Sequence, residues 1–285
     1  MLGKLIKYEL KATSRTFFLM YAGILILAVI NRIFYSIQIG SYSDIFINEN
    51  VSHFSPTGST VLSTLTGIFT SLYFLLAFSM FIVVIVIVLQ RFYKNLFGDE
   101  GYLMLTLPVR SWELIISKAI TAAIWYFACT AVIILSLGIL LSDSFILSVI
   151  SEAFYEIQYE LAELSGIIVP VIVKIFAVYV FAAIGNALPL FACISIGQTW
   201  KKHRVLGAFL AYFGLNTVMQ IVSSTIFAVV GQMPAFQEFF YLETAESFVR
   251  FFDITLIFSV FVTLVLYVIS FFITKHIIEN KIDLE

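Results

Sequence analysis

Residues 61–90 read VLSTLTGIFTSLYFLLAFSMFIVVIVIVLQ, thirty positions without one charged side chain. A helix needs about 20 apolar residues to cross a hydrocarbon layer about 30 Å thick, because each residue adds about 1.5 Å. Five other stretches reach this length, so the sequence predicts six spans: 17–39, 61–90, 114–141, 167–197, 205–231 and 254–274. Only 12% of the residues are charged and the mean hydropathy is +1.03, which leaves too little polar surface for a water-soluble protein. We therefore expect an all-α integral membrane protein with six transmembrane helices in one domain, residues 1–285.

The basic residues predict the side of the membrane on which each loop lies. All but three of the 16 Lys and Arg residues fall in four segments: 1–16, 91–118, 201–204 and 275–281. The remaining loops, near 40–60, 142–166 and 232–253, are acidic instead. Because cytoplasmic loops are enriched in Lys and Arg, the pattern predicts that both termini are cytoplasmic. The same bias explains the lysines without a nucleic-acid partner, and the net charge of −2 averages a basic inner and an acidic outer face.

The N-terminal segment MLGKLIKYELKATSRT, residues 1–16, combines an apolar and a basic face. Its apolar residues recur at helical spacing and its lysines lie mostly on another side, with Leu2, Leu5, Ile6 and Leu10 set against Lys4, Lys7 and Lys11. We expect a short amphipathic helix in the headgroup layer, before the first span turns into the membrane. An ordinary positively charged flank of the first span explains the charges almost as well.

The two longer outer loops carry side chains that suit a membrane surface. Residues 142–166 have an apolar position every three or four residues among acidic ones, which predicts an amphipathic helix on the outer surface. Residues 232–253 are strongly aromatic, as are the interfacial belts of membrane proteins.

The cytoplasmic link at residues 91–113 is unusually apolar for a loop. Gly98 and Gly101 enclose Asp99 and Glu100, which predicts a turn. An apolar patch follows at residues 102–107 and ends at Pro108. Such a patch is not left in water, so the segment either lies on the membrane or fits into a groove of a partner protein.

Segment 91–118, with its run GDEGYLMLTLPVRSWELIISK, resembles the corresponding region of bacterial ATP-binding-cassette permeases of the type-2 (exporter-like) class. The start KLIKYELKATSR, residues 4–15, resembles the N-terminal elbow helix of those proteins, and the layout of six spans is similar over the whole chain. The resemblance implies a cytoplasmic coupling helix between spans two and three that sits in a groove of an ATPase subunit. Five residues would lie in or beside it: Asp99, Glu100, Tyr102, Leu103 and Leu107. Packing of the loop on the membrane surface is the alternative for these residues.

The resemblance also implies a function. The chain would be the membrane-spanning permease subunit of an ATP-driven transporter in a bacterial plasma membrane, exporting a lipid-like, drug or antimicrobial-peptide substrate. A second permease subunit, identical or different, would complete the path, and helices within 232–253 would dip back into the membrane. The sequence contains no G-x-x-x-x-G-K-[ST] motif, so ATP would be bound and hydrolysed by a separate subunit. We expect no catalytic residue, cofactor or metal in this chain, because it also lacks the H-E-x-x-H and C-x-x-C patterns.

Two other functions remain open. A sensor or scaffold subunit that does not transport would use the same loop to dock a cytoplasmic partner. A secondary transporter driven by an ion gradient is less favoured, because its acidic residues would lie at mid-membrane and those of this chain lie in loops or at the ends of spans.

Four polar residues within the spans are candidates for a substrate path or a helix interface. Lys174 would face a substrate or an acidic partner such as Glu163 or Glu243, or it would extend its ammonium group to the outer headgroups. The other three are amides. Asn186 is close to Pro189 and predicts a kink in span four, whereas Asn216 and Gln220 are one turn apart in span five and predict hydrogen bonds across a helix interface.

Overall fold

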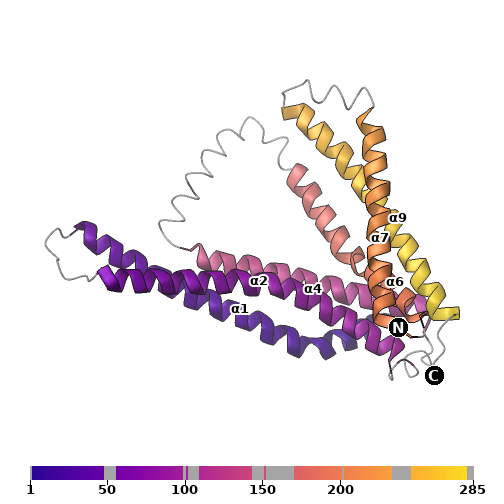
Figure 1. Cartoon of the computed structure of the whole chain (residues 1–285), viewed down its shortest axis with the longest axis horizontal. Helices are drawn as coiled ribbons and strands as arrows, with labels where there is room; N and C mark the ends of the chain where they lie inside the picture. Colours follow the sequence, from indigo (N-terminus) through magenta and orange to yellow (C-terminus); the bar gives the residue numbers. More distant parts are fainter. Residues whose placement is uncertain are drawn as a thin grey trace. The chain divides into compact units, whose positions relative to one another are not determined.

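A computed structural model of the chain describes residues 2–47, 56–98, 109–142, 170–200, 202–232 and 245–280, together with Gly101 and Ser151. These residues are almost entirely α-helical, and none of them lies in a strand. Figure 1 labels α1 (Leu2–Ile47), α2 (Pro56–Phe97), α4 (Ser111–Leu140), α6 (Ala187–Gln198), α7 (Arg204–Gly231) and α9 (Ala245–Asn280). A further helical stretch, residues 170–185, precedes α6.

Six described segments are long and apolar enough to cross a membrane: Leu2–Ile37, Thr60–Phe97, Ser111–Leu140, Pro170–Gln198, Arg204–Val229 and Phe251–Asn280. Each overlaps one of the six stretches expected from the sequence, so the prediction of an all-α protein with six apolar helices is confirmed for the described residues. Large apolar side chains along them are exposed, among them Phe18, Phe78 and Phe261. Only hydrocarbon covers such surfaces favourably at this length, so the helices suggest a multi-pass membrane protein.

The chain divides into two compact units, each of which is described by itself. The first unit contains Met1–Glu9, Ile87–Ala123 and Gln158–Glu285, and the second contains Leu10–Val86 and Ile124–Ile157. The first unit therefore holds α6, α7 and α9 with short parts of α1, α2 and α4, whereas the second holds the remaining parts of these three helices.

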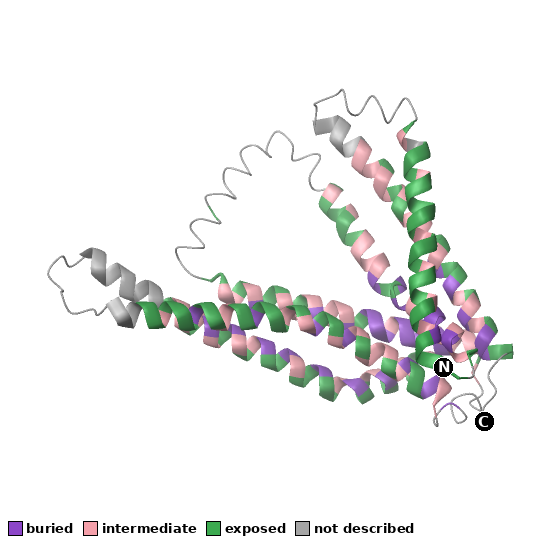
Figure 2. Ribbon diagram, viewed as in Figure 1, coloured by how far each residue is buried: buried purple, intermediate pink, exposed green. Residues whose placement is uncertain are grey.

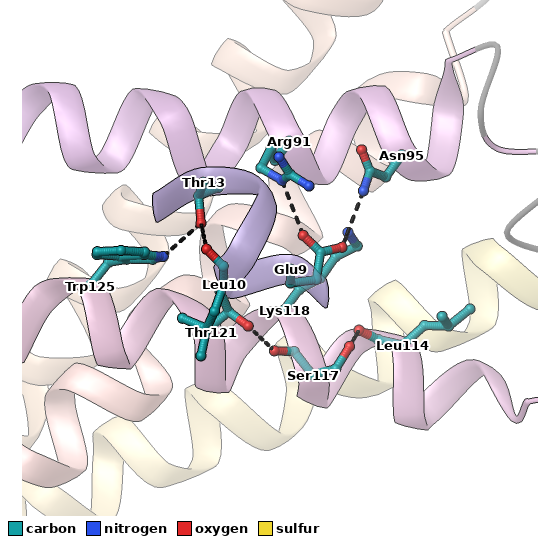
Figure 3. A network of polar contacts seen from close by, with 10 residues as sticks. All are labelled: Glu9, Leu10, Thr13, Arg91, Asn95, Leu114, Ser117, Lys118, Thr121 and Trp125. Carbon is teal, nitrogen blue, oxygen red and sulfur yellow. Dashed lines mark hydrogen bonds and ion pairs between the residues drawn. The ribbon is translucent and has the colours of Figure 1, made fainter. Parts of the chain in front are cut away.

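Hydrogen-bonded aromatic residues join α1 to α4 in the second unit. The rings of Phe17 and Trp125 stack with their centroids 4.2 Å apart. The indole nitrogen of Trp125 donates to Thr13 Oγ1 at 2.9 Å (Figure 3), and the Tyr21 hydroxyl donates to the backbone oxygen of Trp125 at 3.0 Å. Polar groups that are shielded from water need such partners, and here each hydrogen bond also ties two helices together.

Glycine permits a close approach of α6 and α7 in the first unit. A Cβ atom on Gly197 would lie 2.5 Å from the backbone nitrogen of Ala208 and 2.7 Å from the backbone oxygen of Arg204. Real Cβ atoms do not approach backbone so closely, so only glycine fits this position without a shift. The two helices therefore form a tight hairpin.

The predicted surface helix at residues 1–16 is continuous with the first span. Residues 2–47 form one α-helix without an interruption near Arg15 or Phe17. Its position in the headgroup layer stays a prediction. The predicted helix at 142–166 is described only at Ser142 and Ser151, and most of the aromatic loop at 232–253 lies outside the described residues.

Candidate functional site

The buried carboxylate of Glu9 connects three helices, α1, α2 and α4. Lys118 Nζ lies 2.6 Å from Glu9 Oε1 and Asn95 Nδ2 donates to the same oxygen at 3.1 Å, while Arg91 Nε donates to Oε2 at 3.1 Å (Figure 3). The Glu9 and Lys118 side chains are only 8% and 5% exposed, whereas that of Arg91 is 31% exposed. We call these four residues the Glu9 cluster.

Helical spacing explains how the sequence builds this cluster. Arg91 and Asn95 are four positions apart on α2 and therefore share one face of that helix. Lys118 lies in the second turn of α4, which begins at Ser111. Glu9 lies on α1, so one side chain receives a hydrogen bond or ion pair from each of two other helices.

The energetic role of the cluster is alignment more than net stability. Transferring a carboxylate or an ammonium out of water costs several kcal/mol, and good geometry with extra hydrogen bonds offsets that cost. The Glu9 carboxylate has two cations and one amide around it, so both of its oxygens are satisfied. Moving any of the three helices away would leave a buried charge without its partner, so the cluster holds them in one register.

The cluster lies next to the segment for which a coupling role is expected. Arg91 and Asn95 belong to the last two turns of α2, which ends at Phe97, and Lys118 follows the beginning of α4 at Ser111. Residues 98–110 run between these two helix ends. The two helices that flank the segment are therefore tied to α1 through a single carboxylate.

Apolar packing anchors the same helix ends. Phe92 and Leu96 on α2 and Ile115 on α4 are fully buried. The ring of Phe92 stacks on that of Phe191 from α6, with centroids 4.0 Å apart. The last turns of α2 are thus held both by apolar packing and by the Glu9 cluster.

A backbone hydrogen bond joins the two glycines between which the sequence predicts a turn. The amide of Gly101 donates to the backbone oxygen of Gly98 at 2.8 Å, and Gly101 is buried. The expected coupling residues themselves lie outside the described residues: Asp99, Glu100, Tyr102, Leu103 and Leu107.

Lys174 pairs with an acid, but the acid is not one named from the sequence. Its Nζ lies 2.6 and 2.7 Å from the two carboxylate oxygens of Asp253. Glu163 and Glu243, the partners expected from the sequence, lie outside the described residues. Lys174 is near the start of Pro170–Gln198 and Asp253 near the start of Phe251–Asn280, so the pair joins the ends of two candidate spans rather than their middles.

Asn186 interrupts the fourth candidate span, where the sequence predicts a kink. One helical stretch ends at residue 185 and α6 begins at residue 187. The backbone angles of Asn186 between them, φ −60° and ψ −23°, are still helical. Pro189 has no N–H, so it cannot donate to the carbonyl oxygen of residue 185. The Tyr267 hydroxyl of α9 donates to Asn186 Oδ1 at 2.8 Å, and the Tyr267 ring occupies the space that a Cβ of Gly185 would need. The break is thus a packing site for α9.

Asn216 and Gln220 are exposed on α7, which is green along most of its length in Figure 2. The Asn216 side chain donates to the backbone oxygen of Tyr212 on the same helix at 2.9 Å. The hydrogen bonds across a helix interface that the sequence predicts do not occur among the described residues of this single chain.

Glu9 is the functional candidate that reasoning from the sequence missed. A signal for it existed, because Glu9 is the only acidic residue of segment 1–16 and it continues the apolar face four positions before Thr13 and eight before Phe17. All three side chains are buried. An acid on the buried stripe of a membrane helix requires a cation on a neighbouring helix. The inward charge bias alone already explains Arg91 and Lys118, so it hides their role as partners of Glu9.

Comparisons of the chain with protein-family models, with curated proteins and with solved structures find no match.

Proposed function

We propose that this chain is the membrane-spanning permease subunit of an ATP-driven transporter in a bacterial plasma membrane. Both termini and residues 98–110 lie in the cytoplasm, and a separate ATPase subunit hydrolyses ATP. A second permease subunit completes the path for a lipid-like, drug or antimicrobial-peptide substrate. The observation that supports this proposal best is the Glu9 cluster, which ties the two helices that flank segment 98–110 to α1.

The cluster supplies a physical route from the cytoplasmic segment to the membrane helices. A displacement of residues 98–110 by an ATPase subunit would act on the last turns of α2 and the first turns of α4. Because Glu9 binds both, α1 would follow them instead of staying in place. Such a movement does work only if the nucleotide states of the ATPase bind the two conformations with different free energy. The first turns of α1 serve as the elbow helix in this proposal.

Charge and polarity changes within the coupling segment test the proposal. We expect Glu100→Lys and Leu103→Asp to abolish co-purification of vanadate-sensitive ATPase activity with the tagged chain, because the first reverses a charge and the second removes an apolar anchor. Glu279→Lys makes the first charge change on an exposed residue of α9 and is the matched control. Amounts of each variant in the membrane fraction must equal wild type. Retention of ATPase activity by both segment variants contradicts the proposal.

The same preparation separates a transporter from a sensor or scaffold. Proteoliposomes that contain the chain and its ATPase should move substrate in an ATP-dependent way, and the candidates to test are fluorescent lipids, cationic drugs and antimicrobial peptides. ATP hydrolysis without movement of any of these classes would favour the scaffold.

A further inference from the structure

A hollow of about 610 Å³ lies at the beginning of α7. Six residues line it. Three are polar, Lys202, His203 and Arg204, and we call them its polar half; three are apolar, Val205, Leu206 and Phe209, and we call them its apolar half. Lys202 and His203 precede α7 and Arg204 is its first residue, whereas the three apolar residues follow within the first two turns of the helix.

The backbone that frames this hollow is held in place by the α6–α7 hairpin. Gly207 is buried, and a Cβ on it would lie 3.1 Å from Cγ of Trp200 and 3.2 Å from the Cα of Gly197. The Gly207 amide donates to the backbone oxygen of His203 at 2.9 Å. The three polar residues therefore lie directly before or at the start of a helix whose first turns are fixed by close packing.

The polar half of the hollow favours an anion. No acidic side chain lines it, and among the described residues neither Lys202 nor Arg204 has an ion-pair partner. Arg204 is the first residue of α7, so the N–H groups of the first helical turn add the positive end of the helix dipole. Arginine and lysine bind phosphate groups through charge-assisted hydrogen bonds.

The apolar half of the hollow favours a hydrocarbon chain. Its three apolar side chains are exposed: Val205 by 82%, Leu206 by 54% and Phe209 by 62%. Phe209 lies about 7.5 Å along the axis from Arg204 at the helical rise of about 1.5 Å per residue. Arg204 also begins the candidate span Arg204–Val229, so these apolar residues are the first of that span to enter hydrocarbon.

We propose that this hollow binds one anionic phospholipid of the phosphatidylglycerol class. The phosphate is held by Lys202, His203 and Arg204. The part of one acyl chain nearest the headgroup lies along Val205, Leu206 and Phe209. Basic pockets at the ends of membrane helices recognise anionic headgroups in this way. A free phosphate compound would leave the apolar half uncovered, and an acidic protein surface would leave the exposed Phe209 without hydrocarbon. The proposal requires α7 to enter a bilayer but does not depend on the ATPase.

Lipid titration of the purified full chain tests this site. The chain is delipidated in mild detergent, and native mass spectrometry gives the dissociation constant of the first bound phosphatidylglycerol. Each exposed cation near a membrane surface contributes about fivefold in affinity. The double variant Lys202→Gln/Arg204→Gln should therefore weaken the first phosphatidylglycerol by about thirtyfold. The control Lys4→Gln/Lys7→Gln removes two exposed lysines of α1 that do not line the hollow, so it should change the constant of this first site less than about threefold.

Three further arms identify the ligand class. Phosphatidylcholine should bind the wild type at least tenfold more weakly than phosphatidylglycerol, and a hundredfold excess of glycerol phosphate should not displace the lipid. Phe209→Ala should weaken phosphatidylglycerol, because it removes part of the apolar half. If the double variant fails to fold, as judged by gel filtration and thermal melting, the single variants Lys202→Gln and Arg204→Gln are used instead. Each should weaken binding of the first phosphatidylglycerol by about fivefold. Equal loss in the Lys4/Lys7 control, displacement by glycerol phosphate, or equal binding of phosphatidylcholine overturns the proposal. The proposal is also overturned if the double variant binds phosphatidylglycerol as the wild type does but loses a protein that co-purifies with the wild type.

Discussion

The side chain of Glu9 is the clearest case in which a single residue decides how helices are aligned. Its partners come from positions 82 to 109 residues further along the chain, on two other helices. A helical turn of α1 could bury a leucine here at lower cost, because a buried ion pair is often no more stabilising than well-packed apolar residues. A carboxylate instead accepts partners only in one geometry, which suits a part of the molecule that must keep its register.

Glu9→Gln should therefore destabilise the protein strongly. The variant keeps the shape of the side chain but leaves the ammonium of Lys118, which is 5% exposed, without its negative partner. Removal of one member of a buried ion pair costs about 3–5 kcal/mol of unfolding free energy. Glu279→Gln, which removes the exposed acid paired with Lys275, should cost less than about 1 kcal/mol. Thermal and denaturant unfolding in detergent micelles compare the two variants, and equal losses would show that the cluster is not buried as described.

The pairing itself is tested by removing the second charge as well. Lys118→Met alone leaves Glu9 with Arg91, which is 31% exposed and also reaches water. The double variant Glu9→Gln/Lys118→Met contains no fully buried unpaired charge, so its destabilisation should be smaller than the sum of the two single effects by about 1–3 kcal/mol. Additive single effects in the same unfolding assay would mean that the two side chains do not interact.

At the scale of helices, the sequence predicts apolar segments well and side-chain partners poorly. The uncharged run at 61–90 lies within the helix Thr60–Phe97, because length and composition alone decide that a segment suits hydrocarbon. The ion pair of Lys174 with Asp253 joins residues 79 positions apart, and several nearby acids match its charge equally well. Charge shows that Lys174 needs a partner, but only the packing of two helices selects one.

The α6–α7 hairpin gives a prediction at this scale. Gly197→Ala should destabilise the protein by about 1–3 kcal/mol, because the new methyl group would collide with the backbone of Ala208 and Arg204 and push the two helices apart. Gly214→Ala, on α7 with no atom within 4 Å of the added Cβ, is the matched control. The control should be neutral or slightly stabilising, since alanine favours a helix by about 1 kcal/mol over glycine. Thermal melting in micelles measures the stability of both variants. A Gly197 variant as stable as the Gly214 variant would contradict the close packing.

For the whole molecule, the distribution of charge predicts which loops face the cell interior, and thiol labelling can test it. The two native cysteines, Cys129 and Cys193, are buried, so a membrane-impermeant maleimide should label the unaltered chain very little. In intact cells the reagent should label Glu49→Cys in the acidic outer loop and leave Glu100→Cys in the basic link unlabelled.

Permeabilised cells should show labelling of both variants, because the reagent then reaches the two faces equally. This control distinguishes a cytoplasmic Glu100→Cys thiol from one that is covered by protein or lipid. Labelling of Glu100→Cys in intact cells would place segment 98–110 outside the cell, where no ATPase subunit could reach it. The Glu9 cluster would then align three helices for another purpose, and the proposed transport function would have to be abandoned.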